Sequence, residues 1–294
     1  MKRAAWFAVL ALWACDDDGG DATQAGIDMT AAVDGGMSDA AKAADATQTP
    51  DAAPDVSPLA FAEPEDSVVL GDGVRRDVML VPGVSAPANP VTGAETPAEL
   101  NASRVLRFRR EPAVPARAIV VAMPGFLAGA NSYEPLARHL VTRGGEDFPI
   151  EVWVVDRRAN LLEDLRGMNT AEVRGDAQVA DDWYNAGLEI GGESFPGLIP
   201  QAELTFMSEW GAAVHAGDLR AVIDRVPEDA RRGHVFLMGH SLGASFAETY
   251  AGWRFEDGRR GVEDLAGLVL VDGRVPTDPF DEAAYNGGAG EGVI

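Results

Sequence analysis

Cysteine is almost absent from this 294-residue chain, whose only thiol is that of Cys15. A single cysteine cannot form an intrachain disulfide, and His and Cys residues do not recur at the spacing of a zinc site. Basic residues are also few, because 24 Lys and Arg stand against 47 Asp and Glu and give a formal net charge of −23. So acidic a chain is expected to repel nucleic acid and anionic lipid. These absences exclude a disulfide scaffold and argue against a nucleic-acid partner or a metal centre.

The apolar run near the N-terminus, Ala4 to Ala14, is too short to cross a membrane, which takes about 20 residues. Lys2-Arg3 precedes it, and a charged start before a short apolar run is typical of a signal peptide. Leu12-Trp13-Ala14-Cys15 resembles the lipoprotein box of bacteria, in which the peptide is cut before a cysteine that carries lipid. We therefore expect cleavage of residues 1–14, a lipid on Cys15 and export to the bacterial cell envelope. A conventional cleavage site beside an incidental cysteine, giving a periplasmic or secreted product, is the alternative.

Large apolar residues are scarce in residues 15–60, which contain ten Asp, one Lys and mostly Ala, Gly, Thr, Gln and Pro between them. Such a segment buries too little surface to offset the entropy of ordering it, so we predict a disordered tether. Repulsion between the Asp side chains should extend it. Residues 61–294 remain, and they are numerous enough for one domain with a sizeable core.

A pentapeptide in the C-terminal third, Gly239-His240-Ser241-Leu242-Gly243, carries the clearest functional signal. An apolar strand pattern from Val235 leads into it, and a helix pattern from Ala244 to Trp253 follows it. Strand, Gly-x-Ser-x-Gly and helix form a nucleophile elbow, whose tight turn strains the serine backbone and exposes the hydroxyl. Ser241 is therefore the predicted nucleophile, with the Leu242 N–H at the helix N-terminus facing the same space. A plain turn is the alternative for the pentapeptide alone.

A second buried-strand pattern, Ala118 to Met123, ends in Pro124-Gly125-Phe126. This order and spacing resemble the α/β-hydrolase family, whose third strand ends in a His-Gly-aromatic loop, although Pro stands here in place of the His. The resemblance implies that the Phe126 N–H is a second oxyanion donor beside Leu242. It extends from about Arg117 to Asp272 and implies an α/β class with a mostly parallel central sheet flanked by helices.

Histidine is scarce, and none follows the predicted nucleophile; the four in the chain are His139, His215, His234 and His240. The family places its triad in the order Ser, acid, His. The resemblance therefore implies that the base histidine and the last two strands lie beyond Ile294, which leaves the fold incomplete after its sixth strand. His240 should point into the sheet packing, and His215 is a weak alternative base.

Asp272 follows the strand pattern Gly267 to Val271 and stands where a minority of the family carries the triad acid. An ordinary Asp forming a turn with Gly273 is the alternative. The resemblance implies neither a metal nor an organic cofactor for a serine hydrolase of this kind.

Close to 80 residues separate Asp156 from the elbow strand, which is more than a single crossover connection needs. Residues 160–210 contain several aromatic side chains among Gly and Pro, a composition that suits a lid lining an acyl pocket. An extra helical layer of core is the alternative interpretation.

Together these patterns predict a serine hydrolase that cleaves carboxylic esters through an acyl-enzyme at Ser241, with a small-molecule or lipid ester as substrate. The only membrane contact expected is the N-terminal lipid anchor. The missing base supports a second hypothesis, a non-catalytic hydrolase-like surface binding module or an inactive fragment. A third is that the 294-residue chain does not fold stably, because a sheet that ends early exposes an unpaired edge.

Overall fold

The computed structural model describes residues 56–58 and 63–273, all of which belong to the unit that spans Ala52–Ile294. The predicted signal peptide, the predicted lipidation site Cys15 and nearly all of the predicted tether lie outside the described residues. Val56, which falls within the range 15–60, is buried and exchanges two backbone hydrogen bonds of 2.8 Å with Ala116. Core contacts of the folded unit therefore begin before residue 61.

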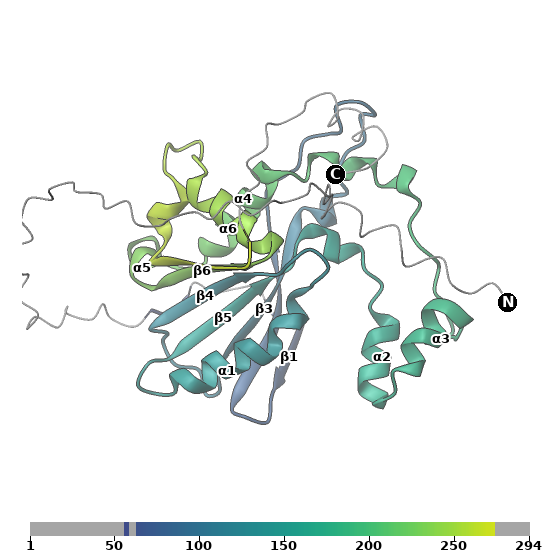
Figure 1. Ribbon diagram of the computed structural model, residues 1–294, viewed down its shortest axis with the longest axis horizontal. Helices are drawn as coiled ribbons and strands as arrows, with labels where there is room; N and C mark the ends of the chain where they lie inside the picture. Colours follow the sequence, from purple (N-terminus) through teal and green to yellow (C-terminus); the bar gives the residue numbers. More distant parts are fainter. Residues whose placement is uncertain (1–55, 59–62, 274–294) are drawn as a thin grey trace, which may run out of the picture. The chain divides into compact units, whose positions relative to one another are not determined.

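The strands of the described part form one sheet in the order β1-β2-β3-β5-β4-β6-β7 (Figure 1). Their bounds are Asp66–Val69 for β1, Val74–Pro82 for β2, Ala102–Arg110 for β3, Ala118–Met123 for β4, Ile150–Val155 for β5, Val235–His240 for β6 and Gly267–Val271 for β7. Neighbours are antiparallel from β1 to β5, whereas β5, β4, β6 and β7 are mutually parallel. The α/β class with a parallel central section is confirmed, and the arrangement is consistent with an α/β-hydrolase fold.

Helices cover both faces of this sheet (Figure 1). α1 (Glu134–Gly144) packs on one face, and α4 (Ala212–Ile223) and α6 (Leu242–Gly252) pack on the other. The other described helices are α2 (Arg166–Arg174), α3 (Gln178–Ala186) and α5 (Glu228–His234). Side chains alternate across β4, so that Val121 packs with the α4 and α6 side chains while Ala122 packs with those of α1. Because both faces are buried, the central strands are almost continuously apolar, which is why their positions could be predicted from sequence.

The edge strand β7 differs from the other parallel strands. Leu268, Val269, Leu270 and Val271 are each about 40% exposed, whereas the paired strand β6 is largely buried. The described residues therefore leave an apolar strand uncovered at this edge of the sheet. Within the same residues, no helix combines the length and the apolar character needed to cross a bilayer.

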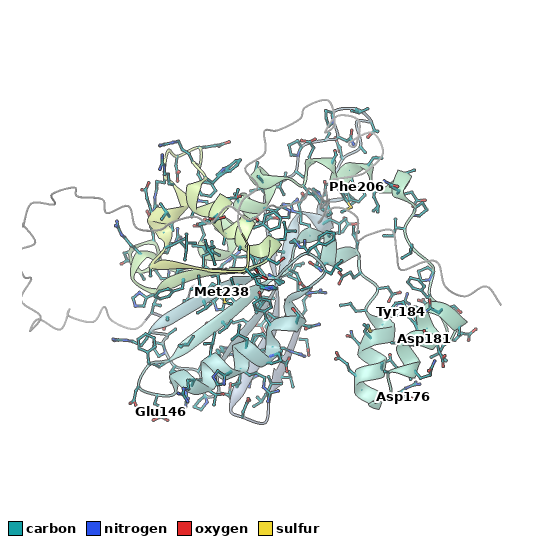
Figure 2. The ribbon with its side chains drawn as sticks, in the orientation of Figure 1. Glu146, Asp176, Asp181, Tyr184, Phe206 and Met238 are labelled. Carbon is teal, nitrogen blue, oxygen red and sulfur yellow. The ribbon has the colours of Figure 1, made fainter. Side chains whose placement is uncertain are left out.

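The long connection between β5 and β6 contains a helical pair, α2 and α3, followed by short 3-10 turns. Trp183 of α3 is buried, and Gly167 of α2 lies so close that a Cβ there would be 2.5 Å from the Trp183 ring. Tyr184, labelled in Figure 2, meets Phe195 edge-to-face with 5.1 Å between ring centroids. Several of the aromatic residues in 160–210 thus pack against one another within this segment.

Candidate active site at the carboxyl ends of the parallel strands

Ser241 lies at the turn between β6 and α6 and has a strained backbone. Its φ is 53° and its ψ is −124°, a region that residues other than glycine seldom enter. The turn is held on both sides, because the Ser241 N–H donates to the Val271 carbonyl and its own carbonyl accepts from the Ala244 N–H, each at 2.9 Å. The backbone geometry is the one predicted for a nucleophile elbow.

Both flanking glycines are required by close backbone approach. A Cβ added to Gly239 would lie 2.2 Å from the Gly243 carbonyl oxygen. A Cβ added to Gly243 would lie 2.1 Å from the Met123 carbonyl oxygen. The first turn of α6 is therefore pressed against the ends of β6 and β4, and only residues without a side chain fit there.

The loop after β4 lies directly against the elbow. The ladder between β4 and β6 pairs Met123 with Gly239, and continuing it by two residues places Gly125 opposite Ser241. The contact confirms this, since a Cβ on Gly125 would lie 3.2 Å from the Ser241 Cβ. Gly125 and the elbow serine are therefore immediate neighbours.

Phe126 and Leu242, the two predicted oxyanion donors, each follow directly after this pair of neighbours. Leu242 is the first residue of α6, so its N–H is one of those that a helix leaves without an intrahelical partner. Phe126 is 54% exposed, which leaves the loop open to an approaching ligand. Gly125, which precedes Phe126, lies against Ser241, which precedes Leu242; the oxyanion role of the two N–H groups stays a prediction.

Asp272 lies on the other side of the elbow. The ladder between β6 and β7 pairs His240 with Val271, so the next residues, Ser241 and Asp272, stand side by side at a strand spacing of about 4.8 Å. Asp272 is exposed and has a φ of 49°. The candidate acid and the candidate nucleophile therefore occupy neighbouring positions, although within the described residues no hydrogen bond joins the Asp272 carboxylate to another side chain.

Arg157 lies beside Gly125 on the side away from Ser241, so that Arg157, Gly125, Ser241 and Asp272 form a row across the strand ends. The sequence analysis assigned Arg157 no role. The ladder between β4 and β5 pairs Ala122 with Val154, and three residues further Gly125 stands opposite Arg157. The Arg157 guanidinium donates to the Gly125 carbonyl at 3.2 Å and also to the Phe126 carbonyl. Burial lowers the pKa of Arg157. The signal in the sequence was Asp156-Arg157-Arg158 after the β5 strand pattern, which resembles a divergent form of the Asp-x-Arg-Gly segment that the α/β-hydrolase family often carries there.

His240 does not point into the sheet packing, and that prediction was wrong. Its side chain is exposed, and its Nδ1 would lie 3.4 Å from a Cβ on Gly125. Successive strand residues face opposite sides, so Gly239 faces α6 and His240 faces the other side, at the sheet end beside the Gly125 loop. His139 lies on α1, and His234 ends α5 with a ring nitrogen 2.9 Å from the Ala230 carbonyl.

His215 lies on the first turn of α4, with its ring 4.2 Å from that of Phe246 on α6. Burial, and then the charges of Arg157 and Arg158, lower the pKa of His215 to about 4. The ring is therefore neutral at pH 7. A general base works best when its pKa lies near the working pH, so this environment makes His215 a poor base.

An apolar groove of about 760 Å³ lies in the connection between β5 and α4. We call it the apolar groove; it is lined by Ala159, Leu162, Glu163, Asp164, Leu165, Met168, Tyr184, Phe195, Pro196, Gly197, Leu198, Ile199, Leu204 and Met207. Ala159 follows Arg157 by two residues, so its backbone lies within about 7 Å of that of the row residue. Met168 and Leu198 are 54% and 90% exposed, which leaves the groove open.

A buried ion pair anchors the start of the β5–α4 connection to α4. Arg158 is fully buried and forms a two-pronged pair with Asp218 of α4, at 2.7 Å for each hydrogen bond. It also donates to the Asn101 side chain at 2.6 Å. In the part of the chain that the structure describes, no three His, Cys, Asp or Glu side chains gather in a way that could hold a metal ion.

Similarity to known proteins is confined to solved structures. No family model and no curated protein matches this chain. A candidate lipase from Sulfolobus solfataricus is 13% identical with a TM-score of 0.46, and the match covers 79% of this chain and 56% of that one. A bacterial heroin esterase (14% identity, TM-score 0.32, 68% and 44% covered) and a cold-adapted esterase from an Arctic intertidal metagenomic library (11%, 0.38, 71% and 65%) also match. This chain spans between 44% and 65% of the length of those three proteins.

Proposed function

We propose that this chain carries the nucleophile of a serine hydrolase that cleaves carboxylic esters. The observation that carries the proposal is the strained backbone of Ser241, with a φ of 53°, at a turn packed against the Gly125 loop. Strain of this kind persists only where the surroundings enforce it, and it concentrates at functional sites. In the proposed reaction the Ser241 Oγ attacks the carbonyl carbon, the alcohol leaves with a proton, and water then hydrolyses the acyl-enzyme.

The developing oxyanion would be held by the N–H groups of Phe126 and Leu242. The contact of Gly125 with Ser241, the residues just before these two, and the position of Leu242 at the start of α6 support this assignment. Backbone donors of this kind need no reorganisation when charge develops, and one of them is typically worth about 10²–10³ in rate.

Proton transfer requires a base, which we assign to a histidine outside this chain. Within the described residues His215 has a pKa of about 4, and the other three histidines lie on α1, on α5 and on the exposed end of β6. We propose Asp272 as the acid that orients the base, because it stands next to Ser241 in the register of β6 and β7.

The substrate would be a small-molecule or lipid ester with a hydrocarbon group. The apolar groove supports this choice, since its exposed wall of Met168, Leu198 and Ile199 offers hydrocarbon contacts in the connection that follows β5. We propose that residues 160–210 act as a lid over the site. A lipid on Cys15 would hold the enzyme at the bacterial cell envelope, and metabolic labelling with an alkyne fatty acid should mark the wild type and not Cys15→Ser.

The decisive experiment treats the native gene product with a fluorophosphonate probe, which labels only activated serines. We expect labelling of the wild type and of the control Ser245→Ala, which removes a hydroxyl one turn further along α6. Ser241→Ala should lose the label and at least about 10³-fold of esterase activity. A wild type that is folded and unlabelled would favour the non-catalytic binding module or an inactive fragment.

A further inference from the structure

Arg157 contacts the backbone of the loop that carries one of the two proposed oxyanion donors. It lies two residues after the end of β5, and its guanidinium donates to the carbonyl oxygens of Gly125, at 3.2 Å, and Phe126. These two carbonyls belong to consecutive peptide groups. The Arg157 side chain therefore hydrogen-bonds to the backbone of the loop and to no side chain of that loop.

The planarity of the peptide group means that the hydrogen bond to the Gly125 carbonyl also sets the direction of the Phe126 N–H. A trans peptide is planar, and its C=O and N–H point to opposite sides. The Gly125 carbonyl and the Phe126 N–H share one peptide group, so a carbonyl held toward Arg157 sends the N–H away from it. β4 lies between β5 and β6 in the sheet, and the side opposite Arg157 is therefore the side of Ser241.

No hydrogen-bonded ion pair to Arg157 forms among the described residues, although the charges of Asp156 and Glu163 oppose the lowering of its pKa by burial. Its neighbour Asp156 pairs with Arg104 at 2.7 Å and accepts the Ala130 N–H at 2.6 Å, and no ion pair to Arg157 forms. The Arg157 Nε is buried without a hydrogen-bond partner among these residues. Burial of a cation costs free energy, and the two loop carbonyls are the hydrogen-bond acceptors that the described residues offer to this guanidinium.

We propose that Arg157 is the positioning residue of the oxyanion hole. By holding the Gly125 and Phe126 carbonyls on the β5 side, it aims the Phe126 N–H at the space above Ser241. A cation bonded to the carbonyl also polarises the N–H of the same peptide group, which strengthens it as a donor. The inference rests on the proposed function, because it assumes that ester cleavage occurs at Ser241.

The test compares Arg157→Met and Arg157→Lys with the wild-type gene product, using p-nitrophenyl butyrate as substrate and phenylboronic acid as an analogue of the tetrahedral intermediate. Arg110→Met is the matched control, since it removes an arginine whose ion pair with Glu146, at 3.6 Å, lies at the opposite end of β5. We expect Arg157→Met to lower kcat about 10- to 100-fold while KM changes less than about threefold. Affinity for phenylboronic acid should fall in parallel with kcat.

Arg157→Lys keeps a charge that reaches one carbonyl, and it should recover part of both losses. A purely structural role would lower the melting temperature and leave the kcat and boronate affinity of the folded enzyme unchanged, as we expect for Arg110→Met. Values within twofold of wild type in folded Arg157→Met would overturn the inference. If that variant does not fold, an unchanged kcat in Arg157→Lys overturns it equally. Activity that survives Ser241→Ala would instead refute the proposed function.

Discussion

Replacing Gly243 by Ala tests whether the elbow is built on backbone contact. The added Cβ would lie 2.1 Å from the Met123 carbonyl oxygen and 2.7 Å from that of Pro124. Even a close C–H···O contact keeps carbon and oxygen about 3.3 Å apart, so α6 and the end of β4 must separate by about 1 Å. Both partners are backbone in the centre of the fold and cannot rotate aside.

The cost follows from two opposed effects. Overpacking of a core costs about 1–3 kcal/mol, and we take the upper end because the contact is backbone against backbone. Ala is favoured over Gly within a helix by about 1 kcal/mol. The expected net loss is about 2 kcal/mol, which corresponds to a fall of about 4–8 °C in melting temperature for a domain of this size.

Gly252→Ala is the matched control, because it lies in the same helix and a Cβ there would meet nothing within 4 Å. It should raise the melting temperature by about 2–4 °C, since only the helix propensity changes. Differential scanning calorimetry of both variants, with fluorophosphonate labelling of each, measures the contrast. If the melting temperatures of Gly243→Ala and Gly252→Ala agree within about 2 °C, the first turn of α6 is not in close backbone contact with the end of β4.

Three further predictions concern groups buried around the site. Asp218→Asn leaves the buried Arg158 without its carboxylate and should cost about 3–5 kcal/mol in urea unfolding; a loss below about 1 kcal/mol would show that water replaces the pair. The Tyr250 hydroxyl is buried without a hydrogen-bond partner in the described part, so Tyr250→Phe should raise the free energy of unfolding by about 1 kcal/mol, and a lower value would reveal an unseen partner. His215 has a pKa of about 4 when folded, and in the unfolded chain it gains a proton below about pH 6.5. Folding stability is therefore lost as the pH falls from 6.5 to 4, by about 3 kcal/mol, and His215→Phe should lose less than the wild type over that range. Equal slopes would contradict the lowered pKa.

The strands and the elbow could be predicted from sequence because their signals are local. The apolar runs at Ala118–Met123 and Gly267–Val271 coincide with β4 and β7. In β4 the near-continuous hydrophobicity reflects burial on both faces of the sheet. β7 has the same apolar pattern, although its side chains are about 40% exposed in the described residues. The Gly-x-Ser-x-Gly spacing likewise reports a tight turn that five consecutive residues define.

The direction of His240 and the role of Arg157 could not be obtained in this way. Which face of β6 remains exposed depends on what covers the sheet at that end. The residue type of His240 does not indicate which way its side chain faces. Arg157 meets the Gly125 loop because β5 pairs with β4, although more than 30 residues separate them in the chain. Neither fact is encoded in a local pattern.

The sequence alone therefore determined that a serine stands on a strained turn between a buried strand and a helix. The tertiary structure decided which other groups surround it, because the parallel register aligns Arg157, Gly125, Ser241 and Asp272 across four strand ends. Hydrogen bonding between neighbouring strands fixes that register to the residue, and a shift by one would turn each side chain to the other face. The neighbours of the serine are thus set by pairings between distant segments, which exist only once the sheet has formed.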